Sequence, residues 1–204
     1  MKYEWKKNEK HLYGIKQTPE LVDVPSQKFI MIQGAGNPNE ADFSDRISTL
    51  YSLAYSIKML FKFMMKNESD DKITDFTVYP LEGIWEKTDE DGLDKDKLKY
   101  TLMIKQPDFI TQEIFLNALE NIQKKKPSVL YNKVSFGCID GGKAIQILHI
   151  GSYDTEPASF EKMDKLTKEL GVFRCADSHR EIYLSNKNKT SEDKLKTILR
   201  YSVR

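Results

Sequence analysis

The sequence has little cysteine, no excess of either charge and no long hydrophobic run. Its two cysteines, Cys138 and Cys175, do not have the spacing of a zinc or redox motif. With 32 basic and 31 acidic residues the formal net charge is +1, which argues against nucleic acid as the main partner. No apolar stretch reaches the length of a signal sequence or a membrane span. We therefore expect a cytoplasmic protein with no membrane or nucleic-acid partner, no metal and no cofactor.

Two common sequence motifs are missing as well. The segment Gly34-Ala35-Gly36 lacks the third glycine of a dinucleotide site and the lysine of a phosphate loop. No serine stands in a nucleophile elbow. The 204 residues, 39% of them hydrophobic, can nevertheless form a real core. The composition thus predicts a globular protein whose chemistry does not follow these motifs.

One pattern occurs twice along the chain. An apolar run at 29–32 ends at a glycine, and a polar link and a helical pattern from about residue 42 follow. The run 145–150 also ends at a glycine, before a helical pattern near residue 159. Each copy then reaches a strand bearing tyrosine and glutamate, at 77–82 and at 180–184. The repeat predicts an α+β fold of duplicated strand–helix–strand–strand modules, with pseudo-twofold symmetry and a central ligand cleft.

We expect one domain over 1–204, divided into three parts. Module 1 spans about 27–106, a connecting helix about 109–126, and module 2 about 129–204. The first 22 residues are predicted to form an arm on the surface. Further strands are expected near 74–86, 100–105, 129–139, 143–150, 180–185 and 197–203, and a charged turn near 89–97. Because Asp140-Gly141-Gly142 is a strong turn signal, a hairpin is expected between 129–139 and 143–150.

Acidic and aromatic side chains in the two matching strands form the candidate site. Glu181 and Tyr183 share a strand face, because residues two apart in a strand point the same way. Glu82 lies in the matching strand of module 1, near Trp85. A carboxylate held among aromatic rings loses hydration and becomes a stronger general base. Tyr153 or Tyr79 could supply a hydroxyl donor for charge that develops on a substrate.

Each candidate also has a structural interpretation. Buried glutamates can serve only to hydrogen-bond a tyrosine or arginine, and Arg180 alternates to the face opposite Glu181. Tyr153 follows a strand end, where a turn role is as reasonable as a ligand role. Trp85 is by base rate a core residue. A lone His149 on an apolar strand is more often a structural histidine than a base.

Three segments together resemble the GyrI-like small-molecule-binding family. They are His149-Ile150-Gly151-Ser152-Tyr153, His179-Arg180-Glu181-Ile182-Tyr183-Leu184 and Tyr79-Pro80-Leu81-Glu82-Gly83-Ile84-Trp85. The resemblance covers about residue 20 to the end. It implies two modules that pack side by side around a concave ligand site. Some stand-alone members of the family hydrolyse the strained cyclopropane of DNA-alkylating natural products, whereas others only bind ligands, a gyrase-inhibiting protein among them.

The residues and the resemblance lead to three hypotheses. The first is a hydrolase of cyclopropane-bearing genotoxic compounds, with water activated by a carboxylate. The second is a non-catalytic binder or sensor of flat, possibly cationic drugs, and the third is an interaction protein that binds another protein. For the first, the candidate catalytic residues are Glu181, Glu82 and Tyr153. The candidate ligand-binding residues are Trp85, Tyr79, Tyr183, Tyr55 and His149.

Overall fold

A computed structural model describes residues 1–69, 71–86 and 95–204. The strands are β1 (Lys2–Tyr3), β2 (Glu20–Val24), β3 (Gln27–Ala35), β4 (Asp75–Phe76), β5 (Leu81–Glu86), β6 (Lys99–Gln106), β7 (Ser135–Ile139), β8 (Gly142–Ile150), β9 (His179–Tyr183) and β10 (Lys196–Ser202). The α-helices are α1 (Trp5–Asn8), α2 (Lys10–Tyr13), α3 (Ala41–Met64), α4 (Gln112–Lys125) and α5 (Glu156–Glu169). Short 3₁₀ helices are η1 (Lys95–Lys97), η2 (Val129–Lys133), η3 (Tyr153–Thr155) and η4 (Glu192–Lys194). The α+β class is therefore confirmed.

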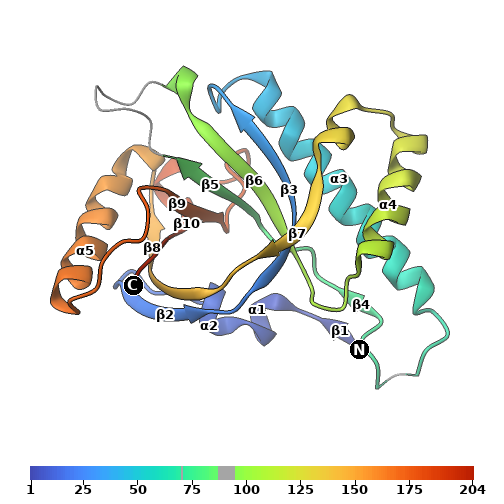
Figure 1. Ribbon diagram of the computed structural model, residues 1–204, viewed down its shortest axis with the longest axis horizontal. Coiled ribbons are helices and arrows are strands. Elements are labelled where there is room, and N and C mark those ends of the chain that lie inside the picture. Colours follow the sequence, from blue (N-terminus) through green and yellow to red (C-terminus); the bar gives the residue numbers. More distant parts are fainter. Residues whose placement is uncertain (70, 87–94) are drawn as a thin grey trace.

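An eight-stranded antiparallel sheet forms the centre of the molecule, in the order β2-β8-β10-β9-β5-β6-β3-β7 (Figure 1). The segments β3-α3-β5-β6 and β8-α5-β9-β10 have the same element order and fill the two halves of this sheet. Strands β5 and β9 pair at the join, where Gly83 faces Glu181 across the ladder. The two segments meet where β5 pairs with β9, and we call this join the midline of the sheet.

The helices α3 and α5 pack on the same face of the sheet, at opposite ends of it (Figure 1). Apolar side chains at helical spacing bury one side of α3, which explains why this segment forms a core helix. Those that become buried include Phe43, Leu50, Leu53, Ile57 and Phe61. Met163 of α5 enters a second, smaller cluster with Ile147 of β8 and Leu199 of β10. We call this side of the sheet the helix face.

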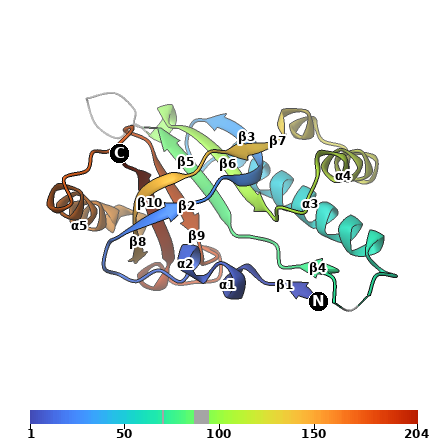
Figure 2. The same cartoon turned by 60° about the horizontal axis from the view of Figure 1, so that its bottom comes forward.

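The N-terminal arm, residues 1–16, covers the other side of the sheet, which we call the arm face (Figure 2). Trp5, Leu12 and Tyr13 are buried there in the main core. The prediction of an arm on the surface was therefore wrong. The arm is fixed to the domain by apolar burial, because these large side chains leave water when it packs.

Three further predictions need correction. Residues 129–133 form η2 and not a strand. The strand β2 falls partly within the predicted arm. The hairpin at Asp140-Gly141-Gly142 does not form, because β7 pairs with β3 while β8 pairs with β2 and β10. Gly142 adopts a φ of 150°, so the glycine-rich link turns the chain away from β7 instead of folding it back.

The other predicted elements agree with the structure within a few residues. The strand predicted near 74–86 is divided into β4 and β5, and Pro80, which has no backbone N–H to donate, lies in the break between them. The predicted charged turn near 89–97 lies mostly outside the described residues. In the described part of the chain, no helix combines the length and the hydropathy that a membrane crossing requires.

Candidate functional site

The central strands place a group of polar side chains on the helix face, between α3 and α5. In the ladder Gly83 lies opposite Glu181, and Trp85 lies opposite His179. Tyr183 follows on the same face two residues after Glu181, as the strand period predicts. Glu181 and Trp85 therefore reach the same region from the two halves of the sheet.

Both carboxylate oxygens of Glu181 are held by neighbours. The Tyr183 hydroxyl donates to Oε2 at 2.7 Å, and His179 Nε2 lies 2.9 Å from Oε1. The indole N–H of Trp85 donates in turn to the Tyr183 hydroxyl oxygen at 2.9 Å. This chain of donors fixes the carboxylate in one orientation.

A second carboxyl, Glu156, enters the site from the start of α5. One donor atom each from Glu156, His179 and Glu181 lie within 4.8 Å of one another. Glu156 is 7% exposed, and its Oε1 atom has no hydrogen-bond partner among the described residues. Burial raises the pKa of the Glu156 carboxyl to about 9, and the nearby Glu181 charge adds to the rise. At neutral pH Glu156 therefore holds a proton beside Glu181, and we call the two the carboxyl pair.

The raised pKa of Glu156 predicts that the free energy of unfolding falls as the pH rises through the neutral range. The unfolded chain releases this proton near the ordinary carboxyl pKa of about 4.3, whereas the folded protein keeps it up to about pH 9. The stabilisation from this proton is complete below the unfolded pKa of about 4.3, and it is lost as the pH rises to the folded pKa of about 9. Glu156→Gln should remove this slope and raise the free energy of unfolding at about pH 8, by up to roughly 5 kcal/mol at about 1.4 kcal/mol per pH unit above the unfolded pKa. Urea unfolding at about pH 5.5 and 8 measures it, and equal slopes in both proteins would contradict it.

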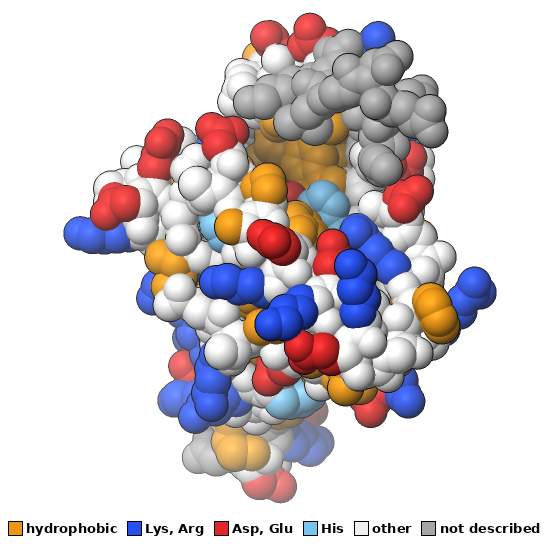
Figure 3. Space-filling model, turned by 90° about the vertical axis from the view of Figure 1, so that its left-hand side faces the viewer, with side chains coloured by type: hydrophobic (Ala, Val, Ile, Leu, Met, Phe, Trp, Pro, Cys, Tyr) orange, Lys and Arg blue, Asp and Glu red, His pale blue; other side chains and the backbone are white. Residues whose placement is uncertain are grey.

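Aromatic rings border the carboxyl pair. The Tyr153 ring packs edge-on to Tyr183, with ring centroids 6.1 Å apart. The Phe160 ring of α5 packs edge-on to His179, with ring centroids 4.9 Å apart. Phe43 of α3 stacks on Trp85 at 5.9 Å. Burial raises the pKa of Tyr153 to about 12, so its hydroxyl remains a proton donor. On the side of the molecule that carries α5, Figure 3 shows a recess floored by hydrophobic side chains, with acidic and histidine side chains near its rim.

Glu82 is not part of this group, contrary to the sequence interpretation. It lies on the arm face, fully buried, and Arg180 Nε donates to its Oε2 atom at 2.5 Å. The strand period explains the correction, because Glu82 and Trp85 are an odd number of positions apart and point to opposite faces. Glu82 thus takes the structural role that was considered for buried glutamates.

Three predicted ligand-binding residues also lie outside the group. Tyr79 is buried beneath the N-terminal arm, where its hydroxyl donates to Glu9. Tyr55 is 54% exposed on the solvent side of α3. His149 is buried on β8, with Nδ1 2.9 Å from the Ser159 hydroxyl, so it holds the turn that leads into α5. Tyr153, Trp85, Tyr183 and Glu181 are the predicted residues that the structure brings together.

Three residues of the site were not predicted from the sequence, namely Glu156, His179 and Phe160. His179 stands two residues before Glu181, so the strand period could have placed it on the same face. Glu156 and Phe160 reach the site through packing of α5, for which the sequence carries no signal. The donor types of Glu156, His179 and Glu181 could also hold a divalent cation, which the sequence did not suggest.

Comparison with known families gives a match over most of the chain. The GyrI-like small molecule binding domain matches residues 17–202. The chain belongs to the GyrI-like family. The resemblance noted in the sequence is thus confirmed, and small-molecule binding is the function common to the domain. No match was found among curated proteins.

Solved structures include similar proteins from Listeria innocua. A hydrolase from this organism shares 33% identity over 99% of the GyrI-like chain and 100% of its own, with a TM-score of 0.86. An uncharacterized conserved protein from the same organism shares 34% identity over 99% of this chain and 100% of its own, with a TM-score of 0.88. The C-terminal domain of EcmrR shares the fold alone. Its identity is 13% over 92% of this chain and 97% of its own, with a TM-score of 0.54.

Proposed function

We propose that this GyrI-like protein is a hydrolase that opens the strained cyclopropane ring of genotoxic alkylating compounds. The observation that carries the proposal is the carboxyl pair among aromatic rings, where burial raises the pKa of Glu156 and neighbours hold both carboxylate oxygens of Glu181. Similarity to a Listeria hydrolase over the whole chain supports the enzyme class. The duplicated-module interpretation is part of the proposal, since it places the ligand where β5 and β9 pair.

Glu181 would act as the general base. Its carboxylate accepts the proton of a water molecule while the water oxygen bonds to the unsubstituted ring carbon. The donors Tyr183 and His179 hold the carboxylate in place, which reduces the entropy cost of reaching the reactive geometry. Ring strain supplies much of the driving force, so the protein needs to provide a base and accurate placement.

Glu156 would act as the general acid. When the ring carbon–carbon bond breaks, its electrons move to the conjugated carbonyl, whose oxygen becomes negative. The proton of Glu156, or the hydroxyl of Tyr153, can neutralise that oxygen. Water is added overall, with one proton taken up by Glu181 and one released by the acid. The two carboxyls then exchange the proton to restore the starting state.

Mass spectrometry of the reaction mixture tests the proposal. Purified protein incubated with a cyclopropane-bearing alkylator should yield a product one water heavier, faster than buffer alone. The Glu181→Gln protein serves as the control for hydrolysis by the solvent. A compound that returns unchanged from the wild-type protein would exclude the hydrolase.

The Gly83→Ala variant is expected to slow this reaction by about 10²-fold, because a small displacement of a catalytic group is costly. A Cβ atom at Gly83 would lie 2.9 Å from Trp85 Nε1 and 3.2 Å from the Tyr183 hydroxyl, so it pushes apart the donors that hold Glu181. Gly137→Ala is the matched control, since its Cβ meets only Met31 at 3.4 Å. Turnover rates of the two variants measure the effect, and equal rates would show that the donor chain is not needed.

A second candidate function is binding without turnover. The carboxyl pair lies beside Trp85, Tyr183 and Tyr153, and a carboxylate among aromatic faces favours flat cationic compounds through charge and cation–π contact. A cationic dye that raises the unfolding temperature and is recovered intact, together with no turnover of cyclopropane compounds, would favour this function.

A further inference from the structure

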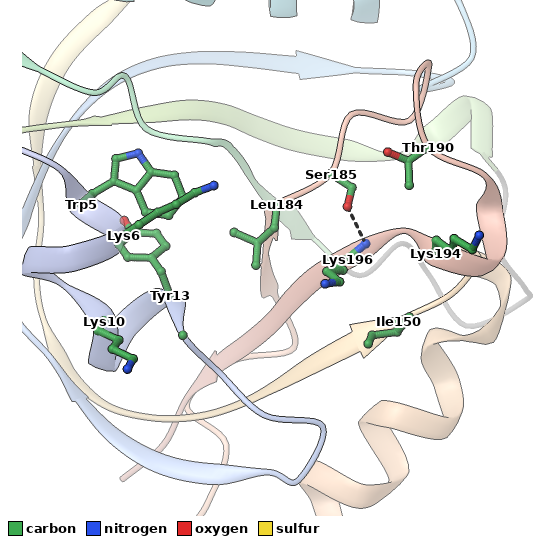
Figure 4. Close-up of a pocket in the computed structure, with 11 residues that line it drawn as sticks. Trp5, Lys6, Lys10, Tyr13, Ile150, Leu184, Ser185, Thr190, Lys194 and Lys196 are labelled. Atoms are coloured by element: carbon green, nitrogen blue, oxygen red, sulfur yellow. Dashed lines mark hydrogen bonds between the residues drawn. The ribbon is translucent and has the colours of Figure 1, made fainter.

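A second concave site lies on the arm face of the sheet. It is a groove of about 760 Å³ between the N-terminal arm and the β9–β10 connection. We call it the basic groove, and Figure 4 shows its lining. Trp5 and Tyr13 lie at one end, Leu184 lies in the middle, and Thr190 and Lys194 lie at the other end. Its volume falls in the range of small-molecule sites.

Charge of one sign surrounds this groove. Lys6, Lys10, Lys194 and Lys196 line it, and no acidic side chain does so among the described residues. In the same part of the chain, none of the four ammonium groups forms an ion pair with a carboxylate. The chain as a whole is balanced at +1, so this concentration of positive charge is local. Positive potential in a concave surface attracts anions.

The walls of the groove are rigidly held. Glu9 of the arm forms a buried ion pair with Lys105 of β6. The Trp5 indole N–H donates to the Val78 carbonyl at 3.0 Å, and Arg200 donates to the Leu12 carbonyl at 2.9 Å. The arm is thus held in a fixed position, with Trp5 and Tyr13 each 6% exposed, and ligand binding would not need to order it.

The basic groove is separate from the carboxyl pair. Leu184 follows Tyr183, whose side chain lies on the helix face, so the Leu184 side chain points to the arm face. Lys196 precedes Thr197, the strand partner of Tyr183, so its side chain also points to the arm face. The arm residues that form one wall lie outside the range matched by the GyrI-like domain, 17–202. The groove therefore depends on a segment beyond that domain.

We propose that the basic groove binds a small aromatic anion, such as an aryl carboxylate, sulfonate or phosphate. Leu184 and the exposed edge of the arm contact the ring, and Lys194 and Lys196 pair with the acidic group. The hydroxyls of Thr190 and Ser185 lie near these two lysines and can donate to an anionic oxygen. The carboxyl pair, by contrast, repels anions, so the two sites select ligands of opposite charge.

Fluorescence titration tests the proposal with 8-anilinonaphthalene-1-sulfonate as the anionic probe and N-phenyl-1-naphthylamine as its neutral counterpart. We expect the Lys194→Gln/Lys196→Gln protein, which loses both lysines of one end of the groove, to bind the sulfonate about tenfold more weakly, because each exposed ion pair contributes up to about fivefold. Lys125→Gln/Lys126→Gln is the matched control, since it removes the same charge from the C-terminal end of α4. Its affinity should stay within about twofold of wild type.

Salt and the neutral probe complete the test. High salt should weaken sulfonate binding to wild type, and it should have little effect on the neutral probe. Equal sulfonate affinity in the two double variants would overturn the proposal, as would equal affinity of wild type for the two probes. Urea unfolding of both double variants shows that each is folded. A failure of the hydrolase test would not affect this result, because the groove uses none of the catalytic residues.

Discussion

Glu181→Gln is expected to lower kcat for ring hydrolysis by about 10²–10⁴-fold, the contribution of a well-placed general base. The amide keeps the size of the carboxylate and can still accept the hydrogen bond that Tyr183 donates. It cannot take a proton from water, so substrate binding should persist while turnover falls. Single-turnover rates at saturating substrate, followed by mass spectrometry, measure the loss.

Glu82→Gln provides the comparison for this variant. The substitution is chemically the same and lies in the paired strand, but Glu82 is buried on the arm face beside Arg180. Its kcat, measured well below its unfolding midpoint, should stay within about twofold of wild type. If Glu82→Gln lost turnover and Glu181→Gln did not, the base would be assigned to the wrong face of the sheet.

The strand period explains how much of the site the sequence could predict. Glu181 and Tyr183 stand two apart on one strand, and the structure joins them by a hydrogen bond of 2.7 Å. The same period already separates Glu82 from Trp85, so combining these two in one site was an error of interpretation. Which strands meet at the midline is a long-range pairing, and local sequence carries no signal for it.

Glu156 shows what lay beyond the sequence. It stands in a polar link at the start of a helix, where an acidic residue usually serves the helix dipole in solvent. Its role arises only because α5 packs on β8 and buries the side chain beside Glu181. The loss of hydration and the neighbouring charge then outweigh the dipole, and the pKa rises to about 9.

The N-terminal arm was wrongly placed for a related reason. Its charged residues outnumber its apolar ones, which is typical of a surface segment. The structure buries Trp5, Leu12 and Tyr13 and pairs Glu9 with Lys105, a residue far along the chain. An ion pair between residues so distant in sequence leaves no local pattern. The basic groove, which the arm borders, could not be predicted for the same reason.

Arg180→Met is expected to lower the free energy of unfolding by about 3–5 kcal/mol, the cost of leaving a buried charge without its partner. Glu82 is 0% exposed, and its other oxygen has no hydrogen-bond partner among the described residues. Arg180 also donates to the Gln27 side chain at 3.1 Å and lies over the Phe29 ring. The methionine fills much of the same space, so the loss measured by urea unfolding reports mainly on charge.

The double variant Glu82→Leu/Arg180→Met separates the ion pair from its surroundings. Removing both charges leaves an apolar contact, so we expect it to be more stable than Arg180→Met alone and to recover most of the loss. A double-mutant cycle gives the coupling between the two residues. If the double variant were as unstable as Arg180→Met, packing of the arginine would explain the loss. In the expected case the pair holds β5 to β9 on the arm face, opposite the side on which the same two strands carry Trp85 and Glu181.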